Sequence, residues 1–538
     1  MQPSRRDFLQ SSSLICLSSA VSAEAFADLG SGRSSSDNGW NRGDVKHILP
    51  TVSDTQMLIK ASFDRPFDKA PVLRVESREI AGRREDTKGE NWSFHVDNLT
   101  PGKVYKLALW SDQGKALCEP WPLATFPAPN HTAQSFRLLI YTCAGGHELH
   151  AFLPTAVRNK LLRRGLSFNP DALVANGDHV YWDLLAPVGS RLLGGSPAAK
   201  AYAGSFDRSG RVLGDTNEAV LKKSAGPQII PVYGTDFRST PTFFLQDDHD
   251  YYDNDEATDE VVTFPPSFFM MQLARSTQSL YYPEFLSDPN RPSGLPWSSA
   301  ADKAPGVSES FGTLRFGNLA EILLYDVRRT QTMAGPSAVF VDPEVERWLQ
   351  LRTAKGEARH VVHVPSNPPG WTAGKWGEWY PDVLGADGAL TIKEAKPYWQ
   401  TGWLKQHDRL MHAISRQTRN IPLVISGDLH AIALGQMHRT GQVDLSLNPV
   451  NVLLSGPVGC RPGPNGWPSG RRGTGAKPSI HLDLVEEVKP IEQHGFSIVD
   501  FRPDEIRIQM FKWDIKTQSV ADIDALQPFH TKVLPARS

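Results

Sequence analysis

Residues 172–183 read ALVANGDHVYWD, a short apolar run that leads directly into a polar cluster. An apolar run of this length, bounded by Asn-Gly-Asp, is typical of a strand covered on both faces of a sheet. Further runs of the same kind occur at 138–141, 242–245, 322–325, 361–364 and 423–425. Helical patterns lie between some of these runs, at 151–166, 342–356 and 403–416. Alternating strands and helices predict a layered α/β domain.

Polar clusters follow four of these predicted strands at the point where each strand ends. They are 142–148 (TCAGGHE), 176–183 (NGDHVYWD), 246–254 (QDDHDYYDN) and 426–430 (SGDLH). Ligands of α/β sheets bind beyond the carboxyl ends of the strands, so we expect the clusters to converge. Carboxylates, imidazoles and a thiolate form a ligand set for divalent or trivalent metal ions. Closely packed anionic groups would repel one another without a cation, and the sequence therefore predicts a metal site.

Each cluster also has a simpler interpretation when it is taken alone. Gly-Asp after a strand is commonly only a turn. The residues 247–250 (DDHD) could form an exposed acidic loop, and Cys143 could be a small buried apolar side chain. The four clusters in this order favour the metal site over these interpretations.

A separate β domain is predicted ahead of the α/β domain. Short alternating runs at 57–63, 72–75, 92–96 and 104–110 are separated by turn residues, as in a β-sandwich. Residues 99–105 (LTPGKVY) resemble the turn before a late strand in fibronectin type III-like domains. We therefore predict three regions after residue 27, a linker at 28–42, the sandwich at 43–129 and a catalytic domain at 134–538.

The first residues have the pattern of a cleaved export signal. Residues 4–10 (SRRDFLQ) precede a modest apolar run, and small residues follow at 22–27. The adjacent arginines before Phe-Leu resemble the twin-arginine type, whose Tat machinery exports folded proteins. The apolar run is too short and too interrupted for a bilayer span, so we predict no stable membrane anchor. The predicted location is periplasmic or secreted.

Composition limits the class of protein further. Fifty-seven Lys and Arg against fifty-nine Asp and Glu give a net charge of −2 over 538 residues, which argues against a nucleic-acid scaffold that works by charge. The cysteines are Cys16, Cys118, Cys143 and Cys460. Cys16 would leave with the signal, and the three that remain are too few for a disulfide framework. Cys460 lies in a Gly/Pro-rich stretch, 455–468, that we expect to line the substrate entrance.

Three of the motifs resemble the signature blocks of a known family. Residues 177–181 (GDHVY), 247–250 (DDHD) and 426–430 (SGDLH) resemble PhoD-like alkaline phosphatases and phosphodiesterases, a branch of the calcineurin-like metallophosphoesterases. The twin-arginine signal, the leading β domain, residues 326–329 (DVRR) and the helix around 346–349 add to the resemblance. It implies a four-layer α/β/β/α sandwich preceded by the fibronectin III-like β-sandwich.

The resemblance also assigns roles to individual residues. It implies metal ligands at Cys143, Asp178, Asp248, Asp428 and His430. Asp178 would bridge two metals, and Cys143 would bind iron. It implies catalytic groups that face the phosphoryl group at His249 and at Arg328 or Arg329. The implied cofactors are two or more metal ions, iron with calcium or another divalent pair.

Two features depart from the family pattern. PhoD-like enzymes use a Tyr ligand that we expect between the motifs at 177–181 and 247–250, and the segment 204–242 contains only Tyr233, at a poorly matching spacing. The block at 364–369 (VPSNPP) lacks the expected His, and His363 lies early. Tyr181, Tyr233, Asp183 and His363 therefore all stay open as residues that complete the metal shell.

The implied function is hydrolysis of phosphate monoesters or diesters by a hydroxide held between two metal ions. No Gly-x-Ser-x-Gly nucleophile elbow or Walker-type loop occurs in the sequence. One alternative is a phosphodiesterase directed at phospholipids or polymers. An alternative of another class is an exported binding protein with a structural metal site. We expect a monomer whose partner is a phosphate ester.

Overall fold

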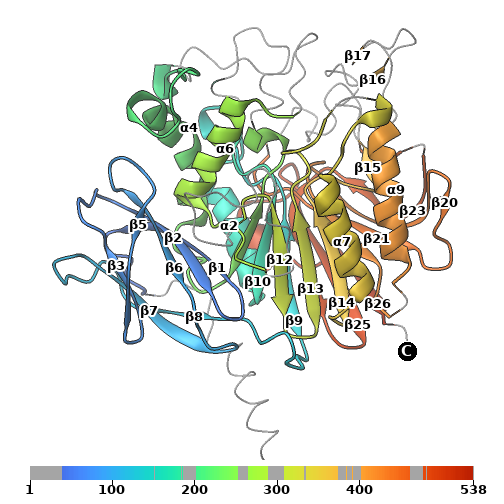
Figure 1. The fold of residues 1–538 in the computed structure, drawn as a ribbon, viewed down its shortest axis with the longest axis horizontal. Helices are drawn as coiled ribbons and strands as arrows, with labels where there is room; N and C mark the ends of the chain where they lie inside the picture. The colour runs from blue at the N-terminus through green and yellow to red at the C-terminus, as the bar shows by residue number, and fades with distance from the viewer. Residues whose placement is uncertain are drawn as a thin grey trace, which may run out of the picture.

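Two large sheets form the centre of the molecule, and a pair of smaller sheets lies beside them (Figure 1). The structure is a computed structural model. It describes residues 39–150, 152–182, 185, 201–251, 265–288, 308–332, 335–372, 383–384, 390–391, 401–417, 419–460, 476–479 and 481–536. The predicted export signal at 1–27 and Asp183 lie outside these ranges.

The first large sheet joins residues from the middle of the chain with residues from its C-terminal end. In spatial order its strands are β11 (Thr242–Leu245), β10 (Ala172–Asn176), β9 (Phe136–Tyr141), β24 (His494–Phe501), β25 (Glu505–Trp513) and β26 (His530–Pro535). β10 pairs in parallel with both β9 and β11, whereas β24 pairs antiparallel with β9. The carboxyl ends of β9, β10 and β11 therefore point to one edge of the sheet.

The second large sheet has a parallel centre and antiparallel edges. In spatial order its main path is β12 (Phe311–Phe316), β13 (Ala320–Tyr325), β14 (His360–Pro365), β18 (Leu423–Ser426), β21 (Val450–Ser455), β19 (Ile432–Thr440) and β20 (Val443–Asp444). β23 (Leu482–Ile491) pairs with β19. β13, β14, β18 and β21 run parallel, so their carboxyl ends also share one edge. The six predicted strands are all present, as β9, β10, β11, β13, β14 and β18.

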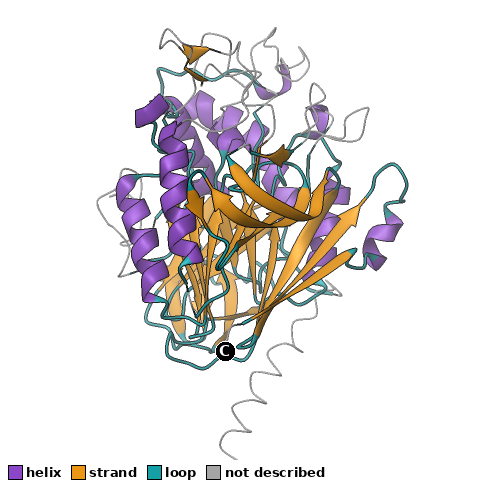
Figure 2. Ribbon diagram, turned by 90° about the vertical axis from the view of Figure 1, so that its right-hand side faces the viewer, coloured by secondary structure: helices purple, strands orange, loops and turns teal. Residues whose placement is uncertain are grey.

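Alternation along the strands separates the layers of the α/β region. Leu138 and Ile140 belong to the core between the two large sheets, whereas Leu139 and Tyr141 pack outward against helices. In the second sheet, Val362 faces the inner core and Val361 faces the outer helices. The result is the predicted α/β/β/α order, with strands at the centre and helices outside (Figure 2).

Helices cover the outer face of each large sheet. On the first sheet they are α2 (Thr155–Leu166), α4 (Asp215–Tyr233) and α6 (Phe268–Tyr281). On the second sheet they are α7 (Pro343–Lys355) and α9 (Thr401–Ser415). Asp342 caps α7 by accepting a hydrogen bond from the Glu344 N–H at 2.8 Å. The 3-10 helices are η1 (Glu148–His150), η3 (Asp248–Tyr251), η4 (Gly335–Ser337) and η6 (Ala521–Ala525).

The N-terminal region forms a sandwich of two four-stranded antiparallel sheets. One sheet contains β1 (Val45–Val52), β2 (Met57–Phe63), β6 (Asn91–Val96) and β5 (Arg83–Arg84). The other contains β4 (Arg78–Ala81), β3 (Val72–Val75), β7 (Val104–Trp110) and β8 (Trp121–Ala124). The buried Lys60 on β2 donates to the Ser279 carbonyl of α6 at 2.9 Å, so the sandwich packs on the α/β region. The predicted domain boundaries stay a prediction.

Two short ribbons complete the described strands. They are β15 (Trp371–Thr372) with β22 (Lys477–Pro478), and β16 (Val383–Leu384) with β17 (Leu390–Thr391). Within the described ranges, none of the helices combines the length and the apolar character that a membrane span requires.

Candidate metal centre

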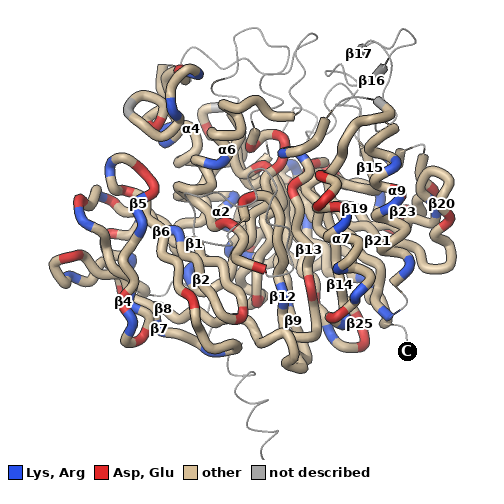
Figure 3. The backbone as a smooth tube through the Cα atoms, in the orientation of Figure 1, with Lys and Arg blue, Asp and Glu red and all other residues tan. Residues whose placement is uncertain are grey.

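Four polar clusters meet where strands of the two large sheets end. Figure 3 shows acidic and basic residues together at the upper ends of the central strands. Gly427, after β18, packs so closely on the first sheet that a Cβ there would lie 2.4 Å from Thr142 Oγ1. Thr142 Oγ1 in turn donates to the Asn176 carbonyl at the end of β10, at 2.6 Å. The small residue at 427 and the Thr142 hydroxyl therefore bring the two sheets together at this edge.

Three residues of the site have left-handed backbone conformations. The φ angles are +50° at Cys143, +58° at Asp178 and +63° at Asp428. A non-glycine residue with this conformation costs of order 1 kcal/mol or more, and such residues gather at functional sites. Each of the three lies two residues after the end of a strand, β9, β10 or β18, at the edge where the ligand groups meet.

The possible ligand atoms fall into three groups of buried residues. In each group the ligand atoms lie within 4.8 Å of one another. The sulfur group is Cys143, His430 and Cys460. The middle group is Asp178, Asp248 and His249, and the acidic group is Asp247, Asp248 and Asp428. Asp248 belongs to two of the groups, so these two groups adjoin.

Asp178 and Tyr181 connect the sulfur group to the middle group. Cys143 Sγ lies 3.2 Å from Asp178 Oδ2, and the Tyr181 hydroxyl donates to the same oxygen at 2.8 Å. The Tyr181 hydroxyl also lies 2.9 Å from His430 Nε2. A thiol, a phenol, an imidazole and a carboxylate thus face one another inside the protein.

Arg328 lies inside the acidic group and is completely buried. Its Nε donates to Asp247 Oδ1 at 2.6 Å, and its Nη2 donates to Asp428 Oδ2 at 3.1 Å. Burial lowers the pKa of this guanidinium, but the charges of Asp247, Asp248 and Asp428 outweigh burial and raise the pKa above its usual value. Arg328 therefore stays charged and compensates part of the negative charge of the group.

The donor chemistry of the site fits metal ions. Burial raises the pKa of the Cys143 thiol and of the Tyr181 phenol, and the charge of Asp178 raises both further. Burial also raises the pKa of Asp247, with neighbouring carboxylates adding to the effect of burial although Arg328 opposes it. The anionic forms of these groups need more positive charge than Arg328 supplies, and a cation bound by them would provide it.

Comparison with known proteins identifies the fold. No family model and no curated protein sequence matches the chain. A solved structure of PhoD is 13% identical with a TM-score of 0.60, over 91% of this chain and 90% of that chain. A purple acid phosphatase from yellow lupin (Lupinus luteus) seeds is 10% identical with a TM-score of 0.52, over 92% of this chain and 75% of that chain.

The chain shares its fold with PhoD and with the purple acid phosphatase. Both likenesses cover more than nine-tenths of the chain, so each includes at least part of the N-terminal sandwich as well as the large sheets. The three ligand groups lie at the carboxyl ends of parallel strands, where ligands of layered α/β proteins bind.

Within this fold, six of the eight predicted site residues come together in the three groups. They are Cys143, Asp178, Asp248, His249, Asp428 and His430. Arg328 joins them through its two carboxylate contacts. Their individual roles stay predictions.

Three other candidates lie away from the groups. Arg329 is buried against Glu309 at 3.2 Å and the Tyr251 hydroxyl at 2.9 Å. The Tyr233 hydroxyl accepts a hydrogen bond from the Tyr141 hydroxyl at 2.9 Å on the outer side of the first sheet. His363 Nε2 lies 2.8 Å from the Thr353 hydroxyl of α7. These contacts favour packing roles for Arg329, Tyr233 and His363.

Four further residues, to which the sequence analysis gives no definite role, lie at the site, and one of them is Asp247 in the acidic group. Tyr181 is only one of several open candidates in the sequence, because the Tyr ligand is expected after the motif at 177–181 rather than inside it. Asn367 follows β14, and its Nδ2 lies 3.5 Å from Asp428 Oδ2. Cys460 comes from the stretch expected at the substrate entrance, yet its side chain is fully buried. The one sequence signal that points to Tyr181 as a site residue is its place three residues after Asp178.

Asp250 braces the turns that carry the ligands. Its carboxylate accepts hydrogen bonds from four backbone N–H groups, those of Asp178, His179, Val180 and Asp247, at 2.9 to 3.0 Å. The side chain is buried, so no water replaces it as acceptor when it is removed. The Asp-Asp-His-Asp cluster therefore contains a structural carboxylate as well as candidate ligands.

We expect Asp250→Ala to destabilise the protein by more than about 3 kcal/mol, because each buried N–H left without an acceptor costs roughly 1–3 kcal/mol. The measurement is the midpoint of denaturant unfolding. Asp483→Ala, on the exposed side of β23, is the control and should change stability by less than about 0.5 kcal/mol. Equal midpoints for the two variants would contradict the bracing role.

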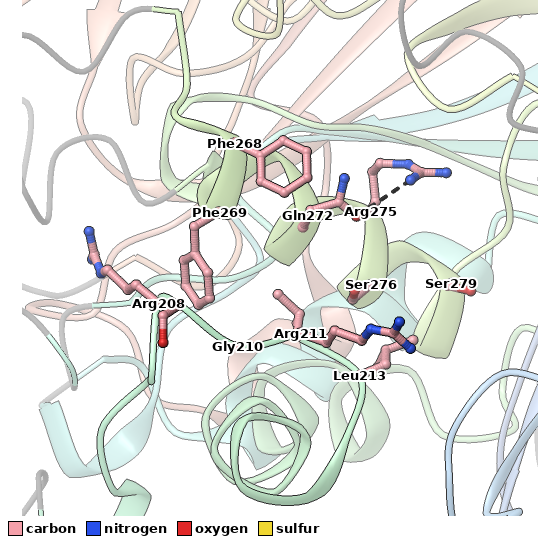
Figure 4. A pocket seen from close by; sticks show the side chains of 12 residues that line it. Arg208, Gly210, Arg211, Leu213, Phe268, Phe269, Gln272, Arg275, Ser276 and Ser279 are labelled. Atoms are coloured by element: carbon pink, nitrogen blue, oxygen red, sulfur yellow. Dashed lines mark hydrogen bonds between the residues drawn. The ribbon is translucent and has the colours of Figure 1, made fainter.

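A separate cavity of about 500 Å³ lies beside α6 (Figure 4). Phe268, Phe269 and Arg275 of α6 line it together with Arg208 and Arg211. Arg275 is held by Glu309 at 2.8 Å. None of the described residues that line this cavity belongs to the three ligand groups, so the cavity adds no group to the metal centre.

Proposed function

We propose that the protein is a metal-dependent phosphoesterase that hydrolyses phosphate monoesters or diesters. One observation carries the proposal. The middle and acidic ligand groups share Asp248, and both lie at the strand ends of a fold that the chain shares with PhoD. Two metal ions held side by side neutralise the phosphoryl group, activate water and stabilise the leaving oxygen.

Each part of the site suits a different kind of cation. The thiol, imidazole and phenol around Cys143 suit a transition metal such as iron. The carboxylates Asp248 and Asp428, with the amide of Asn367, suit a hard cation such as calcium. Asp178 lies between the two sets and would contribute to both. Iron with calcium is therefore the pair that we propose.

The remaining polar residues would position groups or move protons. Arg328 fixes Asp428 by a charge-assisted hydrogen bond and is a positioning residue. His249 packs on the Tyr181 ring with 4.1 Å between ring centroids, and its side chain reaches the middle group. We propose that His249 faces the phosphoryl oxygen or the leaving oxygen and donates a proton there.

Export belongs to the same proposal and rests on the N-terminal sequence. The twin-arginine pattern in residues 4–10 supports delivery of the folded protein to the periplasm or the medium. Folding before export would suit metals that are inserted in the cytoplasm.

Metal removal tests the proposed activity. The purified full chain is assayed with p-nitrophenyl phosphate and bis(p-nitrophenyl) phosphate before chelation, after chelation and after return of iron and calcium. We expect turnover of at least one ester to fall by orders of magnitude on chelation and to recover with metal. Metal-loaded protein that hydrolyses neither ester would favour the binding protein with a structural metal site.

If metal analysis shows that the protein is metal-free and the protein is still active, this result contradicts the metal-dependent mechanism directly. The ratio of the two rates gives the preference between monoester and diester. Assays with phospholipid and polymer esters then show whether the enzyme is a phosphodiesterase for large substrates instead of one for small phosphate esters.

A further inference from the structure

Cys460 has no part in the function proposed so far, yet it lies in the sulfur group. Its side chain is fully buried, and its Sγ lies within 4.8 Å of both Cys143 Sγ and a ring nitrogen of His430. Cys143 and Cys460 are 317 residues apart in the sequence. Their approach is therefore a product of the fold rather than of local chain geometry.

The backbone before Cys460 is fixed alongside the segment that carries Cys143. The Thr142 N–H donates to the Gly456 carbonyl at 2.9 Å, the Val458 N–H to the Thr142 carbonyl at 3.1 Å, and the Gly459 N–H to the Cys143 carbonyl at 2.8 Å. A Cβ at Gly459 would lie 2.4 Å from the Ala144 carbonyl oxygen, so glycine permits this approach. Cys460 is thereby held beside Cys143.

Hydrogen bonding also fixes Cys460 itself. His494 Nε2 lies 3.1 Å from the Cys460 carbonyl, which can only accept, so this ring nitrogen donates. The backbone of Cys460 is thus held in place, and its Sγ lies 3.9 Å from the Cys143 carbonyl oxygen.

Cys118 is a buried cysteine with a packing role only, and it serves as a comparison for Cys460. It lies in the N-terminal core, away from the three ligand groups, and burial raises the pKa of its thiol to about 11. Cys460 differs because a second thiol and an imidazole surround it, with the Tyr181 phenol and the Asp178 carboxylate adjacent to that imidazole. Two thiols and an imidazole whose ligand atoms all lie within 4.8 Å of one another are the residue types that bind one metal ion together in tetrahedral sites.

We propose that Cys460 is a second thiolate ligand of the metal ion that Cys143 and His430 bind. The inference rests on the proposed metal-dependent function, because it assigns one more ligand to the same centre. Two thiolates make the site softer and more negative than one thiolate does. The site should then favour Zn²⁺, Co²⁺ or iron over Mg²⁺ and Ca²⁺.

Cobalt absorption tests the assignment. The full chain and the variants Cys460→Ser, Cys143→Ser and Cys118→Ser are each loaded with one equivalent of Co²⁺, and the thiolate-to-cobalt charge-transfer band is measured together with bound cobalt. Since the band grows with the number of thiolates, Cys460→Ser should retain about half of the wild-type intensity per bound cobalt. Cys118→Ser should retain all of it. A Cys460→Ser spectrum equal to wild type overturns the proposal.

X-ray absorption at the cobalt edge of the wild-type protein gives a second measurement that needs no variant. We expect two sulfur neighbours at about 2.3 Å, the usual metal–thiolate distance. One sulfur neighbour overturns the assignment of Cys460, even if Cys460→Ser fails to fold.

The same samples distinguish this inference from the proposed function. Wild-type protein that binds metal and hydrolyses esters, but has one sulfur neighbour, contradicts only the role of Cys460. Wild-type protein that binds no cobalt, iron or calcium contradicts both proposals together.

Discussion

Asp178→Asn should lower kcat by about 10³-fold while the fold persists, because the variant removes a charge from the centre of the site without changing its shape. Asp178 Oδ2 faces both the Cys143 thiol and the Tyr181 hydroxyl, so its charge acts on two candidate ligands at once. The backbone of Asp178 has a φ of +58°, a conformation that asparagine also adopts readily. The Asp178 N–H keeps its hydrogen bond to Asp250 in the variant.

The measurements are kcat with p-nitrophenyl phosphate, bound metal and the midpoint of denaturant unfolding. Asp483→Asn, an exposed carboxylate on β23, is the control for loss of one charge. Variant Asp178→Asn with wild-type metal content and wild-type activity would rule out a bridging role for Asp178.

His249→Ala should lower kcat by roughly 10²–10⁴, the range for loss of a positioned general acid, and should leave the metal content unchanged. The loss should be larger for an alkyl phosphate than for p-nitrophenyl phosphate, since nitrophenolate departs without a proton. Exposed His412 on α9 supplies the control variant His412→Ala, which should be as active as wild type.

Two outcomes would change the role of His249. An equal defect for both leaving groups would indicate electrostatic contact with the phosphoryl group instead of proton donation. Loss of metal would make His249 a ligand, as its place in the middle group beside Asp178 and Asp248 permits.

The strands at the centre of the fold could be predicted because burial on both faces gives them short apolar runs. Residues 172–175 and 423–425 are of this kind, and both form strands. β24 to β26 were not predicted, because side chains such as Asp500 and Lys532 interrupt their apolar pattern. α4 was missed as well, since it contains prolines at 227 and 231 that disfavour a helix in local sequence reasoning.

The candidate site was predictable where it depended on parallel strands. The polar clusters follow β9, β10 and β11 in the first sheet and β18 in the second. Because the carboxyl ends of parallel strands lie at one edge of a sheet, these clusters are expected at the same edge of the two facing sheets. The contact of Cys460 with Cys143 was not predictable, because it depends on a backbone pairing between segments far apart in the chain. The ion pairs of Arg328 depend in the same way on where β13 lies relative to β11 and β18.

The pairing of β9 with β24 has a consequence for synthesis on the ribosome. Arg137 of β9 and Asp500 of β24, joined by a hydrogen bond of 2.6 Å, are 363 residues apart. At about 5–20 residues per second, roughly 20–70 s pass between the emergence of the two strands. During that time one edge of β9 has no native partner strand and offers unpaired backbone groups to other chains. We therefore expect the nascent protein to need protection of this edge, by a chaperone or by its own preceding segments, until the last part of the chain is made.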